Sequence, residues 1–489
     1  MPLIALTLLT PLAGGLLTAL IRFRGRTARR VWVGAVTLTA SVLAAVLCVS
    51  PPEGTLRLLH FTSLFSLGLR IDGLSRVFIG LLALLWPLAV LYAFEYMTHE
   101  ERENAFFSWY SISFAAVLGV AMAADLFTLY VFYETLTLST LPLVTHKRDA
   151  ASIHAGRKYL VYSLGGAALG FAGMILLTSR GAGMDFRPGG GLIRTGGLDY
   201  TLLRAAFVIA FIGFSAKAAL FPLHAWLPAA SVAPTPVTAL LHAVAVVNAG
   251  AYACLRLVYY SCGTDWLRGT WAQAVPLSLA AFTVVFGSVM AVRERHFKRR
   301  LAYSTVSNLS YMLLGAALMT PAGLTGALTH LVSHGLMKIA LFFCAGAVLI
   351  RTGREYVQDL RGMGRVMPFT FSVYTLAAAA LIGVPPLCGF LSKWNLLTAA
   401  AAAGSWESAV SVGALIVSAI LTAVYAGSVA VAAWFLPPDP ESADPTGRNS
   451  DPGWLMKAPL LILCAAILLM GLRGADVTRF LSDIANGIL

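Results

Sequence analysis

Three ionisable residues, His330, His334 and Lys338, recur at four-residue spacing inside the apolar run LTHLVSHGLMKIALFFCAGAVLI. On a helix of 3.6 residues per turn, each four-residue step rotates the side chain by only about 40°, so all three share one stripe. Ionisable groups at membrane depth cost free energy and are retained mainly where protons or ions pass. Histidine suits a proton relay because its charge changes near neutral pH. The stripe therefore indicates a path for protons or cations.

Four further polar groups stand within apolar runs: Glu134, Lys217, His242 and Lys393. A charge at the centre of a membrane span costs about 2.5–3.5 kcal/mol, so the one glutamate and three lysines, Lys338 included, cost on the order of 10 kcal/mol before pairing. A carboxylate stabilises a protonated lysine, so a Glu134–Lys217 pair that forms and separates would hold and release a proton. We expect that proton to pass through water and His242 to the stripe, and to leave at Lys393.

Each of these residues also has a structural alternative when it is considered alone. A single histidine on a span usually makes a local hydrogen bond, and Lys217 or Lys393 would extend to the headgroups if it stood near a span end. Asp125 and Lys158 are expected to be interface residues of this kind. The set as a whole favours the proton path.

The composition places these groups in a membrane. The chain has 489 residues, 58% hydrophobic and only 12% charged, against about a quarter charged residues in soluble domains. Apolar runs near 20 residues recur, which predicts an all-α polytopic membrane protein with about fourteen transmembrane helices. The first run has no basic segment before it, so we expect a span rather than a signal peptide. The expected spans are 2–22, 31–49, 73–94, 106–123, 125–145, 158–178, 202–222, 235–258, 272–292, 302–320, 325–350, 367–395, 408–435 and 455–472.

The net charge of +13 does not indicate nucleic-acid binding, because the basic residues stand in short loops between spans. The basic clusters are 22–30, 146–158, 293–300 and 351–365. With alternating spans all four fall on one side, which the positive-inside rule makes cytoplasmic. We therefore expect a bacterial or archaeal cell membrane with both termini at the periplasmic or exterior face. The Gly-rich segment 179–201 would be an external loop, and 437–453 a flexible cytoplasmic connection.

No cofactor or metal is expected in this chain. Its six cysteines form no CxxC pair and mostly stand in apolar runs, which favours buried hydrophobic side chains over Fe–S, haem or zinc ligands. No Walker motif or dinucleotide fingerprint is evident. Any redox chemistry would therefore belong to a partner chain.

Two predicted spans are interrupted by proline. One contains KAALFPLHAWLPAASVAPTP at 217–236, and the other contains IGVPPLCGFLSKW at 382–394. Proline breaks the helical ladder, and broken backbone is tolerated in a bilayer where protein or a water-filled cavity satisfies it. Each break lies within about eight residues of a lysine, Lys217 or Lys393. Paired interrupted helices indicate an ion site in an inverted repeat, with simple proline kinks as the alternative.

These runs, together with FYETLTLSTLPLV, RRLAYSTVSNLSYM and HLVSHGLMKIALFFCAGA, resemble the antiporter-like subunits of respiratory complex I, energy-converting hydrogenases and Mrp-type Na+/H+ antiporters. The resemblance covers roughly residues 105–400, and the D-type Mrp subunit is the most similar member. It implies two inverted five-helix repeats, each containing a broken helix, around a hydrophilic axis.

The resemblance also implies roles for single residues. Glu134 and Lys217 match the family's carboxylate–lysine pair, Lys338 its central relay lysine, and Lys393 the lysine of the second broken helix. The residues that match histidines found in part of the family are His242, His330 and His334. Many members have a lysine where this chain has Asn248, and we expect His242 to replace it.

We divide the chain into N-terminal membrane helices (1–104), a proton-translocating core (105–400) and C-terminal membrane helices (401–489). The expected function is proton translocation in a multisubunit complex, driven by a redox partner, as in an NADH:quinone oxidoreductase-type translocase, or by exchange against Na+. A charge crossing 100 mV is worth about 2.3 kcal/mol, and the chain carries no energy source of its own. Two alternatives stay open: a standalone secondary cation/H+ antiporter, and a structural anchor for a redox module, which leaves the buried charges unexplained.

Overall fold

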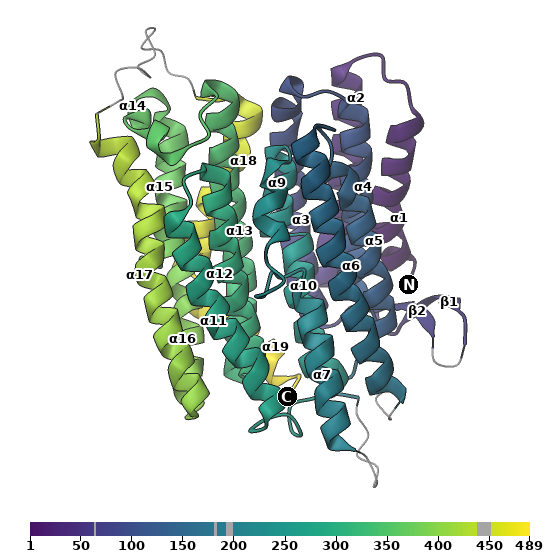
Figure 1. Ribbon diagram of the computed structural model, residues 1–489. Helices are drawn as coiled ribbons and strands as arrows, with labels where there is room; N and C mark the ends of the chain where they lie inside the picture. The colour runs from purple at the N-terminus through teal and green to yellow at the C-terminus, as the bar shows by residue number, and fades with distance from the viewer. Residues whose placement is uncertain (63–64, 180–182, 192–198, 438–450) are drawn as a thin grey trace.

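The structure is a computed structural model that describes residues 1–62, 65–179, 183–191, 199–437 and 451–489. Most of the polar segment predicted at 437–453 lies outside the described residues, as does part of the loop predicted at 179–201. The described chain is mostly helical with one antiparallel β-hairpin, and its helices stand side by side as a bundle (Figure 1).

All the elements of the described chain are helical except the strands β1 and β2. The N-terminal part forms α1 (Pro2–Leu20), α2 (Arg26–Val49), β1 (Leu56–His60), β2 (Ser66–Leu69), α3 (Gly73–Tyr96), η1 (Met97–His99), α4 (Glu103–Met122), α5 (Leu126–Val144), α6 (Ala150–Ser179) and α7 (Tyr200–Ser215). The middle forms α8 (Trp226–Ala229), η2 (Ala230–Val232), α9 (Thr235–Ala243), α10 (Val246–Arg256), η3 (Leu257–Cys262), α11 (Trp271–Arg293), α12 (Phe297–Ala317) and α13 (Pro321–Thr352). The C-terminal part forms η4 (Val357–Leu360), α14 (Met363–Val366), α15 (Pro368–Ile382), α16 (Cys388–Ala402), α17 (Trp406–Phe435), α18 (Trp454–Leu472) and α19 (Gly474–Asn486).

The predicted class of polytopic helical membrane protein is confirmed. Within the described residues, 11 helical segments are long and apolar enough to cross a membrane. Shorter apolar helices, α7 and α15, occupy the two spans that the sequence predicts to be interrupted. Helix α12 is not among the eleven, because polar side chains follow one another between Ser304 and Ser310. The count of fourteen spans and their arrangement as inverted repeats stay predictions.

Side-chain caps fix where several helices begin. Asp72, Asp125, Asp199 and Thr320 each accept a hydrogen bond from a backbone amide in the first turn of the helix that follows. Such caps satisfy amides that have no partner inside the helix. Burial raises the pKa of Asp125 to about 6, even though its bonds from Thr128 act in the opposite direction. Asp125 thus stands at the edge of α5, where the sequence predicts an interface residue.

Both predicted helix breaks are present. Helix α7 ends at Ser215, and the chain is irregular until α8 begins at Trp226; α15 ends at Ile382, and α16 begins at Cys388. In the first break the Trp226 indole donates to the Ala216 carbonyl at 2.9 Å. A side chain of the protein thus supplies a hydrogen bond to a backbone carbonyl at the break.

The four basic clusters gather at one end of the bundle, together with the loop between α3 and α4. The ion pairs that join these loops are Arg26–Glu103 at 2.9 Å, Lys147–Glu100 at 3.7 Å and His296–Glu355 at 3.6 Å. This end is at the top of Figure 1, and both chain termini are drawn at the lower part of the bundle. The clustering agrees with the predicted alternation of spans. Which end faces the cytoplasm stays a prediction.

A buried ion pair joins α3 to α10 at the other end. Arg256 is wholly buried and donates to both carboxylate oxygens of Asp72, at 2.5 and 2.8 Å. It also donates to the Tyr252 hydroxyl at 2.7 Å and the Ser75 hydroxyl at 2.8 Å. Burial alone would raise the pKa of Asp72, but Arg256 more than offsets this and holds the pKa below its usual value.

We expect Asp72→Asn to lower the free energy of unfolding at pH 7 by about 3 kcal/mol, because it leaves the Arg256 charge buried without its carboxylate. Since the folded pKa of Asp72 lies below its unfolded value near 3.9, the pair contributes above that pH and its contribution is lost as the pH falls through the folded value. Thermal unfolding of the purified chain should therefore separate variant and wild type at pH 7, and less so in acid. Asp476→Asn, which removes the exposed partner of Arg473, is the control and should change little. Equal destabilisation by the two variants would contradict this role.

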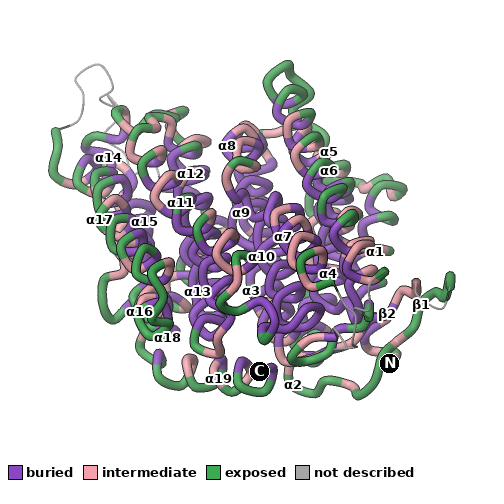
Figure 2. Tube along the Cα trace, turned by 60° about the horizontal axis from the view of Figure 1, so that its bottom comes forward, coloured by how far each residue is buried: buried purple, intermediate pink, exposed green. Residues whose placement is uncertain are grey.

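Two segments at the centre of the bundle are buried along most of their length (Figure 2). The apolar window is 100% buried in Thr235–Cys262, which comprises α9, α10 and η3, and 89% buried in Pro321–Thr352, which is α13. A helix enclosed by other helices does not face lipid, so it can carry polar side chains that find partners inside the bundle. The elements that hold His242 and the histidine–lysine stripe are therefore both enclosed by other helices.

Candidate functional site

The predicted pair between Glu134 and Lys217 is formed. Glu134 stands in the middle of α5, Lys217 follows the end of α7, and the distance between Lys217 Nζ and Glu134 Oε1 is 3.3 Å. Lys217 is wholly buried, donates to the Tyr133 carbonyl and lies over the Tyr133 ring, 3.3 Å from its centre. Glu134 Oε2 is buried and has no hydrogen-bond partner among the described residues. One carboxylate oxygen holds the lysine, and the other can accept a proton or a water hydrogen.

A glycine lets α10 pack directly against the first break. A Cβ atom at Gly250 would lie 2.5 Å from the amide nitrogen of Ala218 and 2.9 Å from Cβ of Lys217. Real Cβ atoms do not approach backbone so closely, so this contact needs glycine. The run NAGAY thus brings α10 and Asn248 beside the lysine.

A third helix break, which the sequence did not predict, lies between α9 and α10. Helix α9 ends at Ala243 and α10 begins at Val246, with no proline or glycine at the junction. The break leaves carbonyl groups without helical partners. Asn248 Nδ2 donates to the Ala243 carbonyl at 2.9 Å, and His334 Nε2 lies 3.0 Å from the His242 carbonyl oxygen. The break therefore links α10 and α13 through backbone oxygens of α9.

His242 lies at this break as a wholly buried side chain. Its ring stacks on Phe342 with the centres 4.7 Å apart, and neither ring nitrogen has a hydrogen-bond partner in the described chain. A carbonyl oxygen only accepts, so the bond to the His242 carbonyl places a hydrogen on His334 Nε2. The His334 Nδ1 atom is left without a described partner. Both histidines thus keep ring nitrogens available for proton transfer.

The stripe of His330, His334 and Lys338 lies on α13 as predicted, and all three side chains are wholly buried. The rings of His330 and His334 are 6.1 Å apart. His330 Nδ1 lies 3.0 Å from the hydroxyl of Ser392 on α16, and its Nε2 has no described partner. The stripe therefore connects the α9 break to the element that carries Lys393.

Lys338 is held by neutral oxygen atoms. Its Nζ donates to the Leu301 carbonyl at 3.1 Å and to the Ser304 hydroxyl, both on α12. Tyr425 of α17 donates its hydroxyl hydrogen to the same Ser304 oxygen at 2.9 Å. Among the ion pairs of the described residues none contains Lys338, so it differs from Lys217 in having no carboxylate beside it.

Lys393 lies on α16 just beyond the second break. Its Nζ donates to the Ile382 carbonyl at 3.0 Å and lies 5.6 Å from the centre of the Tyr311 ring. Beside it is a cavity of about 160 Å³ whose lining includes Tyr311, Gly383 and Leu415. That volume has room for several water molecules. Lysines therefore stand at both interrupted helices, one against a carboxylate and one against a cavity.

Hydroxyl groups continue along α12 between the last two lysines. Ser304 contacts Lys338, and Tyr311, seven residues further on, lies near Lys393. Between them Ser307 forms a buried cluster with Ser288 of α11 and Ser418 of α17, with oxygen atoms 2.7–3.1 Å apart. These residues are not among the sites predicted from the sequence, although the polar residues of the run STVSNLSY were a signal for them.

We call Glu134, Lys217, His242, Asn248, His330, His334, Lys338 and Lys393 the polar row. Six side-chain atoms of the row are buried and have no hydrogen-bond partner among the described residues. The six are Glu134 Oε2, His242 Nδ1, His242 Nε2, Asn248 Oδ1, His330 Nε2 and His334 Nδ1. Buried polar groups in proteins are almost always satisfied, by ordered water where no protein group reaches them. The row is therefore suited to hold a chain of water molecules.

The described residues contain no group of three or more His, Cys, Asp or Glu side chains that could hold a metal ion. The carboxylate, amine, imidazole and hydroxyl groups of the polar row are of the kinds that bind and release protons in proteins.

Comparison with known proteins finds that most of the chain matches subunits of membrane complexes. Residues 123–433 match the family described as "NADH:quinone oxidoreductase/Mrp antiporter, TM", and residues 61–107 match "NADH-Ubiquinone oxidoreductase (complex I), chain 5 N-terminus". NADH-quinone oxidoreductase subunit N of Desulforudis audaxviator is 34% identical over 83% of this chain and 82% of its own length. Hydrogenase-4 component B of Escherichia coli is 32% identical over 67% of this chain, which spans only 50% of that longer relative.

A chain of a solved membrane complex has the same fold. A chain in the structure of the Mrp complex from Dietzia sp. DQ12-45-1b matches with a TM-score of 0.84 and 24% identity, covering 100% of this chain and 98% of that one. At this level of identity the match shows the fold alone. The matched family covers the helices that carry every residue of the polar row. The chain therefore belongs to the NADH:quinone oxidoreductase/Mrp antiporter family of membrane subunits.

Proposed function

We propose that this chain is the proton-translocating membrane subunit of a multisubunit complex of the Mrp antiporter, hydrogenase or complex I type. The observation that carries the proposal is the polar row, which holds three lysines, a glutamate and three histidines at the centre of a helical bundle. Family membership supports it, because relatives are named as subunits and components of such complexes. Other membrane subunits of the same complex are its proposed partners, and H+, alone or in exchange for Na+, is the ion moved.

The first proton site is the Glu134–Lys217 pair. While Lys217 Nζ stays 3.3 Å from Glu134 Oε1, the carboxylate stabilises the protonated amine. If the Glu134 carboxylate moves away from Lys217, the lysine loses the partner that stabilises its charge. The lysine then passes its proton through water to the ring nitrogens of His242, which have no hydrogen-bond partner among the described residues. A partner subunit that moves charge near Glu134 would supply the energy for this step.

The second part of the path runs through α13 and α12. His334 lies next to the His242 carbonyl, and Lys338 follows one turn later on the same face. From Lys338 the hydroxyls of Ser304 and Tyr425 begin a hydrogen-bonded route toward Tyr311 and the cavity at Lys393. Hydroxyl groups both donate and accept, so they can pass a proton without holding a charge.

The finer topology belongs to the same proposal. The three spans beyond the eleven would be α7 with α8, α12, and α15 with α16, which gives fourteen. The two breaks then stand in two inverted repeats, one around Lys217 and one around Lys393. With the basic end cytoplasmic, both termini face the periplasm or exterior.

Tyr425→Phe tests the hydroxyl route. The substitution removes one hydroxyl from the Ser304 junction and keeps the buried ring, so we expect an approximately tenfold lower rate of proton translocation with unchanged assembly. Proton uptake into vesicles that contain the complex measures this rate. Tyr356→Phe, on the exposed loop before η4, is the control and should leave the rate unchanged. A normal rate in Tyr425→Phe would remove this hydroxyl from the path.

Reconstitution tests the function as a whole. The purified complex, in liposomes that contain a pH-sensitive dye, should move protons when its redox reaction runs or when a Na+ gradient is imposed. The chain alone should move none, because it lacks an energy-coupling partner. Ion exchange by the chain alone would favour the standalone antiporter, and full pumping by a complex with Lys217→Ala would favour the structural anchor.

A further inference from the structure

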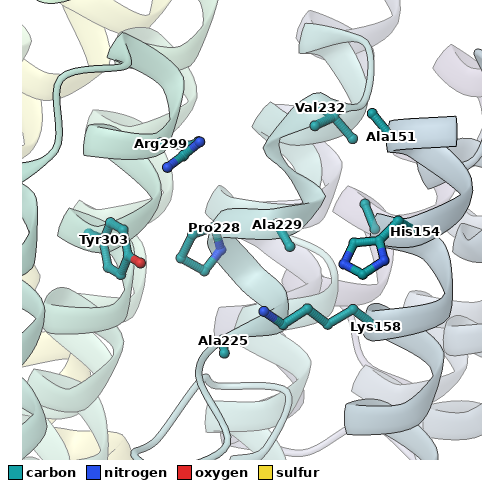
Figure 3. A pocket seen from close by; sticks show the side chains of 10 residues that line it. Ala151, His154, Lys158, Ala225, Pro228, Ala229, Val232, Arg299 and Tyr303 are labelled. Atoms are coloured by element: carbon teal, nitrogen blue, oxygen red, sulfur yellow. The ribbon is translucent and has the colours of Figure 1, made fainter. Parts of the chain in front are cut away.

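A basic cavity lies between α6, α8 and α12 at the end of the bundle that carries the basic clusters. Its volume is about 330 Å³. Figure 3 shows its lining: His154 and Lys158 from α6, Arg299 and Tyr303 from α12, and small side chains of the α8 segment between them. Each helix contributes two residues four positions apart, which therefore lie on one face. Two polar pairs thus face each other across a floor of alanine and proline.

The cavity has the charge of an anion site. Among the described residues that line it there is no aspartate or glutamate. Arg299 donates to Glu294 at 2.9 Å and its side chain stays 51% exposed, while none of the described residues forms an ion pair with Lys158. The Lys158 side chain extends from α6 over Ala225 toward the middle of the cavity (Figure 3). A phosphate there could accept hydrogen bonds from Lys158, Arg299 and the Tyr303 hydroxyl.

A cluster of three aromatic side chains lies in and beside the segment that precedes α8. Phe221, four residues before the cavity residue Ala225, packs on Phe282 and Phe286 of α11 with ring centres 5.0 and 5.3 Å apart. Phe282 is 51% exposed. Both α11 residues lie about two to three turns from Arg293, so they stand deeper in the membrane than the basic end of that helix. The site therefore has a cationic part at headgroup depth and an apolar part at acyl-chain depth.

We propose that this cavity binds an anionic phospholipid, with its phosphate between Lys158 and Arg299 and an acyl chain over Phe221, Phe282 and Phe286. Basic pockets between membrane helices on the cytoplasmic side suit anionic headgroups. The aromatic cluster favours a lipid over free phosphate, which has no apolar part. The site is separate from the polar row, so the proposal stands whether or not the chain moves protons.

Native mass spectrometry of the full-length chain in detergent, with added phosphatidylglycerol or phosphatidylcholine, tests the proposal. We expect the wild type to retain phosphatidylglycerol in preference to phosphatidylcholine, and the double variant Lys158→Gln/Arg299→Gln to bind it roughly 30-fold more weakly. The control Arg22→Gln/Arg24→Gln removes the same charge from exposed positions at the same end and should bind as the wild type does. Lys158→Arg keeps the charge and should retain binding.

Two further experiments distinguish a bound lipid from a free anion and from a neighbouring subunit. Inorganic phosphate and glycerophosphoglycerol, which lacks acyl chains, should not displace the lipid at concentrations a hundredfold above it. Displacement by either would show a free-anion site and overturn the proposal, as would equal losses in the cavity and control variants. The purified complex should retain the same lipid. Its absence there, with Lys158 protected from amine labelling, would show that a neighbouring subunit occupies the cavity and would also overturn it.

Discussion

Replacing Lys217 with alanine should lower proton translocation by the intact complex about 100-fold. General acid–base groups in a proton-transfer path contribute on the order of 10²–10⁴ to its rate, and Lys217 is the amine that faces Glu134. Without the amine, Glu134 has no partner with which to hold and release a proton, so the first site of the path is lost. The measurement is the initial rate of acidification in proteoliposomes driven by the redox reaction or by a Na+ gradient.

Two variants separate this effect from misfolding. Lys147→Ala, which removes a half-exposed lysine at the basic end, should pump at the wild-type rate. Glu134→Gln should reduce pumping to a similar extent as Lys217→Ala, and the double variant should lose no more than either single one, because the two residues act as one unit. Additive losses would contradict a shared proton site.

Lys338→Met should also lower pumping about 100-fold, but it should not lower the unfolding temperature. Lys338 is wholly buried and is held by neutral oxygens of Leu301 and Ser304, so its removal leaves no unpaired carboxylate and relieves the cost of burying a charge. Methionine has a similar length and fills the space. Proteoliposome pumping and thermal unfolding of the same preparations measure the two quantities.

The contrast with Lys217 is the critical control. Lys217→Met leaves Glu134 without its partner and should lower the unfolding temperature relative to Lys338→Met. If Lys338→Met pumps normally, the path does not pass through α13. If it pumps poorly but also unfolds at a much lower temperature, the lysine acts as a structural residue.

The predictions from the sequence were most successful where a single residue type limited the choices. A lysine or glutamate inside an apolar run costs free energy wherever the helix lies, so Glu134, Lys217 and the α13 stripe could be named before any fold was known. Proline cannot continue the helical ladder, so both breaks beside Lys217 and Lys393 were predicted as well. The prediction that the basic clusters share one side agrees with their common end in the bundle.

Other features depend on contacts between distant segments, which a one-dimensional pattern does not contain. The break between α9 and α10 has no proline or glycine, and the hydroxyls of Ser304 and Tyr425 become a junction only because α12 and α17 pack beside Lys338. The cavity at Lys158 and Arg299 likewise needs α6 and α12 to stand on either side of α8.

The amino-acid sequence by itself determined that this is a helical membrane protein with costly ionisable groups inside it, since hydrophobicity and charge are properties of each residue. Only the tertiary structure decided which of those groups meet. Glu134 and Lys217 lie 83 residues apart in the sequence, and it is the packing of their helices that brings them within hydrogen-bonding distance.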